Sequence, residues 1–500
     1  MGAPSVTSRA DRNVLEAMTE IAPGSGDAAD EARLLTSFLP TPRFLVALDP
    51  DILLVLGERG TGKTALFTVL GQQGMAAFAN LGLKRVLRAY AVDAASIPNL
   101  IIDKVLHAAS PARLQAFWLG RLVHTLRGEL GASAAVAAIA SAPTEDARLS
   151  AVEAHLEGAF AALDAYDREL GARDLLASVC YDRLDVMMPT YRGAVSPVGA
   201  LLAFWFAQRR RWRHLRPKVF LRIDLFDAAL AAFPDGAKFF AGHQTELVWS
   251  RLDAWRMWVK RMANHHVHGE RVRRWMSTVS PELRFEAHEV LGHLPVAGLQ
   301  MALFVDSASV DRRAPDERRI APLIYDLVGR YLGANARKGD SFTWIPSHVE
   351  DANGRLLPRP FLHVLRLAAK EALGREADRQ GAFPMIPSDI TRSFDAVSVL
   401  RLREVLDEDP WIAQVAPHLS GMVVPAPLGE WVERVSHVRW SAPSPDEPRA
   451  TLDAGTPPEE VVERLRARGI LERRSDDRFN VPEIYRAALA VKRKGGPSRG

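Results

Sequence analysis

Residues 57–64, G-E-R-G-T-G-K-T, have the types and spacing that bind the phosphates of a nucleotide. They match the pattern G-x-x-x-x-G-K-[ST] at every defined position. Glycines in such a loop let backbone N–H groups turn inward around phosphate oxygens, and the start of the following helix adds a partial positive charge. We therefore expect Lys63 to reach the β- and γ-phosphates of ATP and the Thr64 hydroxyl to bind Mg²⁺. A glycine turn with an exposed lysine is the alternative. The predicted nucleotide-binding residues are Gly57, Gly60, Thr61, Gly62, Lys63, Thr64 and Ala65.

A second anchor for Mg²⁺ is expected at the end of a neighbouring apolar strand. Residues 175–181, L-L-A-S-V-C-Y, form such a run, and Asp182 follows it directly. We predict that Asp182 coordinates Mg²⁺ together with Thr64. The alternative is an aspartate that caps a helix after a core strand.

Asp224 also follows an apolar run, residues 218–223, with Arg222 beside it. It comes later in the chain than Asp182, at the place where many ATPases carry a polar residue that senses the γ-phosphate. We predict this sensor role for Asp224, and the alternative is a structural salt bridge at the edge of the sheet.

Hydrolysis needs a residue that orients or deprotonates the attacking water. Many ATPases carry a second acid immediately after the Mg²⁺-binding aspartate, but Arg183 stands there. Asp185 is the best substitute, and it could equally cap a helix. We therefore expect slow turnover.

Arg359 lies in P-R-P-F-L at residues 358–362, where an apolar-periodic helix begins. An arginine at this position could reach the γ-phosphate from a helical lid and distinguish ATP from ADP. The alternative is a surface arginine near a helix start, which the helix dipole mildly disfavours.

The elements that position these residues follow from the apolar pattern. The run at 52–56 predicts a buried strand, and residues 65–70 predict the first turns of a helix. Further strands are expected at 175–181 and 218–226, separated by a helix at about 197–215, whereas residues 84–170 are typical of helices. Strands that alternate with helices indicate the α/β class with a parallel sheet.

The composition restricts the class of protein and its cellular compartment. The 500 residues are 48% hydrophobic and 25% charged, with a net charge of +4, which is ordinary for a globular protein. The single cysteine, Cys180, excludes an intramolecular disulfide, and no apolar run approaches the ~20 residues of a membrane span. We therefore expect a cytoplasmic protein without a membrane partner.

The motifs in this order resemble those of bacterial AAA+/STAND-like P-loop ATPases, including the KAP-type and origin-recognition-like groups. The likeness rests on G-E-R-G-T-G-K-T, V-C-Y-D-R-L-D, F-L-R-I-D-L-F and P-R-P-F-L, and it covers about residues 31–495. Members of this family are often found in genome-defence neighbourhoods. The resemblance implies an ATP-binding core, a helical lid with a sensor arginine and a C-terminal winged helix. Arg183 departs from the KAP-type pattern, in which another aspartate is common.

We predict an α/β fold with a P-loop NTPase core, a parallel sheet and helical insertions, followed by a helical lid and a winged-helix-like C-terminal domain. Residues 459–495 support the last part, because two amphipathic helices flank a short hairpin with a polar turn. The expected divisions are a flexible tail at 1–30, the core at 31–300, the lid at 301–375, a helical connector with a Pro-rich linker at 376–458, and the winged-helix-like unit with a basic tail at 459–500.

Two functions remain open. The first is a regulatory ATPase that binds ATP and Mg²⁺, hydrolyses ATP slowly, and acts as a switch in a bacterial defence or stress-response assembly. The alternative is an ATP-dependent DNA-binding protein of the replication-initiator or partition type. A protein partner or a homo-oligomer is expected in the first case. In the second, DNA would bind the C-terminal unit, with its basic residues Lys492, Arg493 and Lys494.

Overall fold

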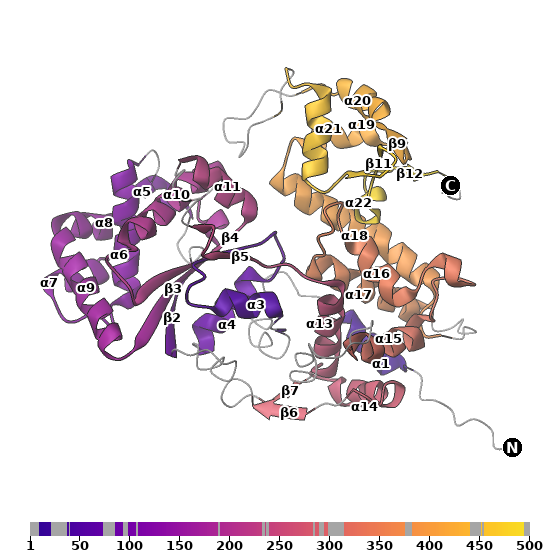
Figure 1. Cartoon of the computed structure of the whole chain (residues 1–500), viewed down its shortest axis with the longest axis horizontal. Helices are drawn as coiled ribbons and strands as arrows, with labels where there is room; N and C mark the ends of the chain where they lie inside the picture. Colours follow the sequence, from indigo (N-terminus) through magenta and orange to yellow (C-terminus); the bar gives the residue numbers. More distant parts are fainter. Residues whose placement is uncertain are drawn as a thin grey trace.

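The chain forms three successive regions: an α/β region, a helical region and a small C-terminal unit (Figure 1). This computed structural model describes residues 10–21, 38–39, 41–73, 86–93, 99–106, 109–188, 191–232, 236, 240–283, 286–289, 295–298, 315–375, 383–440, 452 and 455–494. Among these residues, no helix is both long and apolar enough to span a lipid bilayer.

A five-stranded parallel sheet organises the first region, in the order β2-β3-β4-β1-β5. Because the strands are parallel, the carboxyl ends of β1, β3 and β4 lie at one edge, with β4 between the other two. The residues that follow these three strands therefore meet there. The strands are β1 (Leu54–Leu56), β2 (Val86–Asp93), β3 (Leu175–Asp182), β4 (Leu215–Leu221) and β5 (Gln244–Glu246).

Helices surround this sheet, and α5 to α9 form a group between β2 and β3 in the chain (Figure 1). Apolar side chains from these helices and from the sheet share one hydrophobic core. The helices are α3 (Pro42–Leu48), α4 (Lys63–Gln73), α5 (Asn99–Leu106), α6 (Pro111–Leu126), α7 (Ala134–Ala140), α8 (Glu145–Ala154), α9 (Leu156–Ala172), α10 (Tyr191–Gln208) and α11 (Ile223–Ala232), with a 3-10 turn, η3, at Leu184–Val186.

Two strands differ from the sequence-based expectation. Residues 84–170 are not helical throughout, because β2 lies at 86–93 and pairs with β3 along its whole length. Its leucine, arginine and alanine residues favour helix in isolation, and pairing at the sheet edge overrides that preference. The strand predicted at 218–226 ends at Leu221, and α11 begins at Ile223. Asp224 therefore lies in the first turn of a helix.

The helical region has a hydrophobic core that is distinct from that of the sheet and continuous with the C-terminal unit, and α1 (Arg12–Thr19), α13, α14 and α15 to α18 contribute to it. Since α13 and α14 contribute to this core, the helical region begins near residue 251, before the predicted division at 300. The helices are α13 (Arg251–Ala263), α14 (Gly269–Val279), α15 (Pro315–Val328), α16 (Ser341–Val349), α17 (Pro358–Gly374) and α18 (Pro387–Glu408), with η4 at Ala336–Lys338 and the strand pair β6 (Glu286–Glu289) and β7 (Pro295–Gly298).

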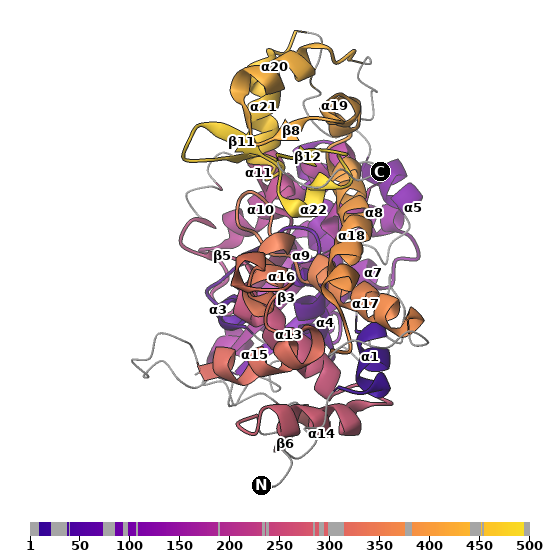
Figure 2. The ribbon, with the colours of Figure 1, turned by 90° about the vertical axis from the view of Figure 1, so that its right-hand side faces the viewer.

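Helix α1 (Arg12–Thr19) corrects the prediction of a flexible tail at 1–30, at least for residues 10–21. Asp11 caps the helix, and Val14, Leu15 and Met18 are buried. The helix packs against α17, beside which it lies in Figure 2. The Ala- and Gly-rich composition around α1 concealed this short apolar stripe, whose partner lies far along the chain. The rest of the predicted tail lies outside the described residues.

The C-terminal unit has the helix–strand–helix–helix–strand–strand order of a winged helix, namely α19, β9, α20, α21, β10 and β11. The three strands form an antiparallel sheet in the order β10-β11-β9. The predicted boundary at 459 cuts through this unit, because α19, β9 and α20 precede it. The elements are α19 (Ile412–Leu419), β8 (Val423–Val424), β9 (Ala426–Pro427), α20 (Leu428–Ser436), α21 (Pro458–Ala467), β10 (Glu472–Arg473), β11 (Arg478–Asn480), α22 (Glu483–Arg486) and β12 (Lys492–Arg493).

Candidate nucleotide-binding site

The loop at 57–62 joins the buried strand β1 to the start of α4, which is the setting that a phosphate-binding loop requires. Gly60 and Gly62 have φ angles of 86° and 99°, a region that only glycine adopts without strain. A side chain at Gly57 would collide with Thr61, since a Cβ there would lie 2.4 Å from its Oγ1. Glycine is thus required at all three positions for the loop to keep this shape.

The Lys63 ammonium group lies against the loop. Its Nζ donates hydrogen bonds of 2.8 Å to the carbonyl oxygens of Gly57 and Glu58. Burial lowers the pKa of Lys63, whereas the nearby Asp182 carboxylate acts in the opposite direction. The side chain is therefore held at the loop, where a bound phosphate would replace the two carbonyl oxygens as its partner.

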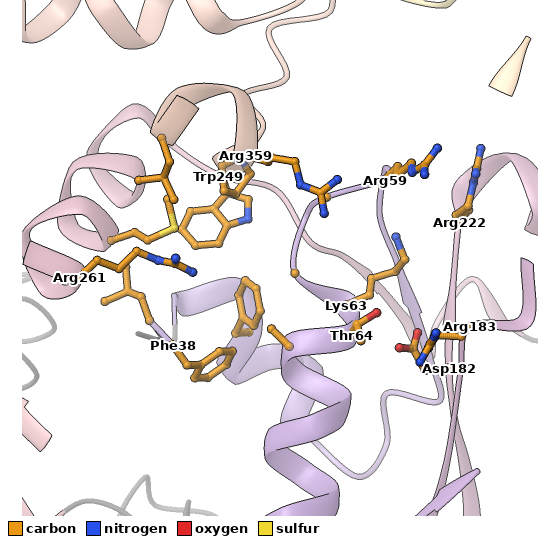
Figure 3. Close-up of a pocket in the computed structure, with 18 of the residues that line it drawn as sticks. Phe38, Arg59, Lys63, Thr64, Asp182, Arg183, Arg222, Trp249, Arg261 and Arg359 are labelled. Atoms are coloured by element: carbon orange, nitrogen blue, oxygen red, sulfur yellow. The ribbon is translucent and has the colours of Figure 1, made fainter. Parts of the chain in front are cut away.

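Asp182 and Thr64 come together at the mouth of the loop, as the sequence predicts (Figure 3). Asp182 ends β3 with only 2% of its surface exposed, and the Thr64 hydroxyl donates a hydrogen bond to its carboxylate. Burial raises the pKa of Asp182 to about 6. Its Oδ2 is buried and has no hydrogen-bond partner among the described residues. A buried carboxylate oxygen without a partner, next to a hydroxyl at a phosphate-binding loop, fits the oxygen ligands of Mg²⁺.

Arg183 turns the chain immediately after Asp182. Its φ of 59° lies in the left-handed region, which costs a non-glycine residue about 1–2 kcal/mol. In return, its backbone N–H donates to the Asp182 carboxylate, and the turn brings Asp185 to the cavity wall. Asp185 lies 3.7 Å from Arg222 in an ion pair, so its role as the base remains a prediction.

Asp224 does not line the cavity beside the loop; Arg222, which directly follows β4, lines it instead. Arg222 binds Asp224 through two hydrogen bonds, Nε to Oδ1 at 3.1 Å and Nη2 to Oδ2 at 2.9 Å. Burial disfavours the charge of Arg222, but the carboxylates of Asp224 and Glu408 raise its pKa. The salt-bridge alternative for Asp224 is thus the arrangement observed, and the γ-phosphate sensor would have to be Arg222.

Arg359 reaches the same cavity from the helical region (Figure 3). It stands in the first turn of α17, where Pro358 and Pro360 flank it. Its side chain is 40% exposed, and Nη1 lies 3.4 Å from Glu404 Oε1. The structure therefore brings Arg359 to the loop, while its role in distinguishing ATP from ADP stays a prediction.

Sequence reasoning missed the apolar end of the cavity, which Phe38, Phe44 and Trp249 line together with Met257 and Leu362. The rings of Phe44 and Trp249 meet edge to face at 5.7 Å, and Trp249 Nε1 donates to the Thr61 carbonyl oxygen at 2.9 Å. These residues come from three separate segments. Of them, Leu362 lies in the P-R-P-F-L stretch on which the resemblance rests, but its apolar side chain gave no sign of a cavity.

The cavity has a volume of about 340 Å³, with aromatic side chains and Arg261 at one end and Lys63, Asp182, Arg59, Arg183 and Arg222 at the other (Figure 3). Such a division suits a ligand with an apolar ring system and an anionic tail. The Lys260 ammonium group, buried in α13, donates to the Phe38 carbonyl oxygen at 2.5 Å and so holds the aromatic end in place. Burial lowers the pKa of Lys260 to about 7.

The sheet order, the loop and the buried aspartate define a P-loop NTPase fold of the α/β class, with a winged-helix-like unit at its C-terminal end. This confirms the predicted fold class. No protein-family profile matches the chain, and no curated protein is similar to it in sequence.

Comparison with solved structures finds archaeal proteins with low similarity. The Aeropyrum pernix ORC2 protein in its ADP form is 14% identical, with a TM-score of 0.33 over 96% of this chain and 99% of that one. The CDC6P protein of Pyrobaculum aerophilum is 12% identical, with a TM-score of 0.31 over 96% and 97%. The Aeropyrum pernix ORC1 protein in complex with DNA is 15% identical, with a TM-score of 0.34 over 96% of both chains. Similarity at this level gives no information about the fold beyond what the strand order already shows.

Proposed function

We propose that this chain binds ATP with Mg²⁺ in the cavity at the 57–62 loop and hydrolyses it slowly. The observation that carries the proposal is the buried, unpartnered Oδ2 of Asp182, which lies beside the Thr64 hydroxyl at the mouth of the loop. Thr64 and Asp182 would hold the metal, which when bound neutralises charge that builds up on the phosphates. Lys63 would exchange its two carbonyl partners for phosphate oxygens.

Slow turnover follows from the partners of the acids around the cavity. Asp185 forms an ion pair of 3.7 Å with Arg222, so its carboxylate is shared with a cation and is a weaker base toward water. Arg183 occupies the position directly after Asp182, and its side chain is exposed. The chain thus supplies strong phosphate and metal contacts but a weak arrangement for activating water. This combination suits a nucleotide switch, in which the bound nucleotide selects between two conformations.

DNA binding is the second candidate, and the winged-helix order of the C-terminal unit favours it. The third helix of that order, α21, does not offer a net basic face, because Glu459, Glu460 and Glu463 on its exposed side offset Arg464 and Arg466. Positive charge is instead carried by the hairpin between β10 and β11 and by the residues of β12. We therefore place any DNA contact on Arg473, Arg474, Arg478, Lys492, Arg493 and Lys494.

A role in a bacterial defence or stress-response assembly rests on the resemblance alone, and the described residues do not favour it over DNA binding. The same holds for a protein partner, for a homo-oligomer and for a cytoplasmic location. We keep the nucleotide switch as the function, with duplex DNA as the first partner to test.

The experiment is ATP turnover by the purified chain with and without duplex DNA, with Lys63→Ala as the blank. Turnover that DNA raises and that Lys63→Ala abolishes would support an ATPase that responds to DNA. Slow turnover unaffected by DNA would leave the switch in place and point to a protein partner. If the wild-type chain and Lys63→Ala both fail to bind ATP, the proposed function is wrong.

A further inference from the structure

Three arginines that line the nucleotide cavity share a feature: each forms an ion pair with the same helix, α18. Arg222 Nη2 lies 3.3 Å from Glu408, Arg359 Nη1 lies 3.4 Å from Glu404, and Arg59 Nη1 lies 3.7 Å from Asp407. The arginines come from the end of β4, the start of α17 and the phosphate-binding loop itself. Figure 3 shows the three around the loop that leads to Lys63. The cavity wall is thus linked at three points to one helix.

The three acids form one face of α18, because positions 404, 407 and 408 are spaced three and four residues apart. They lie in the last two turns of that helix, where the helix dipole disfavours negative charge. The strength of the pairs is graded by burial. Arg222 and Glu408 are only 12% and 7% exposed, whereas Arg59 and Asp407 are 44% and 71% exposed. The Arg222–Glu408 pair is the least screened by water and should dominate above pH 7, because burial raises the pKa of Glu408 to about 7 and the carboxylate is ionised only above that value.

The acidic face of α18 and an anionic ligand would compete for the same cavity arginines. The triphosphate of ATP carries the charges that Arg59, Arg222 and Arg359 would otherwise neutralise. An arginine that turns toward a phosphate oxygen gives up part of its interaction with α18. We propose that the phosphates of ATP compete with Glu404, Asp407 and Glu408 for these arginines, so that ATP binding loosens α18 from the α/β region. This proposal rests on the proposed function, since it assumes that ATP occupies the cavity.

Helix α18 is bonded to the C-terminal unit. Asp409, the residue after Glu408, pairs with Arg468 at the end of α21 at 2.9 Å. Three residues before Glu404, Arg401 Nε donates to the Tyr485 hydroxyl at 3.2 Å, and earlier in α18 the Ser398 Oγ accepts from the Ala488 N–H at 3.0 Å. Bonds therefore join α18 to the C-terminal unit on both sides of its contacts with the cavity. A shift of α18 would be passed to that unit.

The competition has a consequence for affinity, because coupling between two binding events is reciprocal. If ATP weakens the attachment of α18 by some factor, the attachment of α18 weakens ATP binding by the same factor. Removing the acids should therefore strengthen ATP binding, although they are not part of the cavity wall. AMP, which lacks the β- and γ-phosphates, should gain little from the same change.

The test uses the full-length triple variant Glu404→Gln, Asp407→Asn, Glu408→Gln. We expect its ATP dissociation constant to fall by about 5-fold or more, the lower end of typical coupling factors, while that for AMP stays within about 2-fold. We also expect ATP to increase amide hydrogen exchange at the α18 contacts in the wild type and to leave it unchanged in the variant.

A matched control is Glu371→Gln, which removes an ion pair of 3.8 Å between α17 and Arg392 of α18 that does not line the cavity. It should leave ATP affinity unchanged. If the triple variant folds poorly, Glu408→Gln alone serves, because Arg222 keeps Asp185 and Asp224 as partners. Unchanged or weaker ATP binding in a folded variant would overturn the competition while leaving the proposed function intact. A wild-type chain that binds no ATP would instead overturn the function.

Discussion

The charges of the nucleotide cavity and those of the C-terminal unit are arranged in opposite ways. At the cavity, Asp182 and Lys63 are buried, and burial shifts the pKa of each. In the C-terminal unit, acids pair with arginines a few residues away on the surface, as Glu463 does with Arg466 and Asp476 with Arg478. Such local, exposed pairs contribute about 0–1 kcal/mol and compete with water.

This difference indicates where the chemistry lies. Buried charges that are incompletely satisfied are ready to accept a ligand, because a ligand supplies the partner that the fold withholds. Several exposed charges of the C-terminal unit are already paired locally, so the effect of these pairs on function should be small. Substitutions at the cavity should therefore change function strongly, and those in the C-terminal unit should change it weakly.

Asp182→Asn should have the largest effect. The amide removes the negative charge that would hold Mg²⁺, so we expect ATP turnover to fall by about 100-fold or more, on the scale of losing one electrostatic contact to the transition state. The melting temperature at neutral pH should stay the same or rise, because a neutral amide costs less to bury than the carboxylate, whose pKa burial raises to about 6.

The measurement is turnover against Mg²⁺ concentration, together with thermal unfolding. The control is Asp174→Asn, an aspartate at the exposed turn before β3. Equal turnover in Asp182→Asn and wild type would contradict the placement of the metal.

Glu408 should give the next largest effect, as a dependence of stability on pH. Burial raises the pKa of Glu408 from its usual 4.5 to about 7. Since the folded chain holds this proton more tightly than the unfolded chain, the contribution of Glu408 to stability is present below pH 4.5 and is lost as the pH rises through about 7. We expect the melting temperature of Glu408→Gln, relative to wild type, to increase between pH 5 and 8. A constant difference across that range would show that Glu408 is already ionised when buried.

A smaller effect is expected at the basic end of the C-terminal unit. If duplex DNA binds there, changing Lys492, Arg493 and Lys494 to glutamine should reduce the slope of log affinity against log salt concentration by about 3, roughly one per lost phosphate contact. ATP turnover without DNA should not change, because none of these residues lines the cavity. An unchanged slope would remove this surface as a DNA contact.

The smallest effect should come from Glu463→Gln on α21. Glu463 and Arg466 are 58% and 45% exposed, so losing their pair should change the free energy of unfolding by no more than ~0.5 kcal/mol. A change well above that value, measured by thermal or chemical unfolding, would mean that the exposed ion pairs of the C-terminal unit contribute more to stability than exposed pairs usually do.

The sequence predicted those parts of the site that depend on short stretches of chain. The glycine pattern at 57–64 needs only its own loop, and Asp182 needs only the end of one apolar strand. The prediction placed Asp224 at the end of a strand, whereas pairing in the sheet stops at Leu221 and Asp224 lies in the first turn of α11. Apolar character alone does not mark that point.

The parts that escaped prediction depend on contacts between distant segments. Arg222 and Glu408 meet only because the C-terminal end of α18 lies over the edge of the sheet, and no local pattern in either segment indicates this. The apolar end of the cavity combines Phe38 and Trp249 in the same way. The parallel sheet was predictable from alternating strands and helices, whereas the division between the α/β and helical regions was not, because α13 and α14 are ordinary helices that could join either core.

Helix α1 has one more consequence, which concerns the order of synthesis. Its apolar stripe is buried against α17, one of the last helices before the C-terminal unit. At a rate of roughly 5–20 residues per second, the ribosome needs tens of seconds after making α1 to produce α17. During that interval Val14, Leu15 and Met18 lack the surface that covers them in the folded chain. The apolar residues of α1 are therefore open to non-native association until α17 emerges. A chaperone that binds α1 during this interval would prevent it.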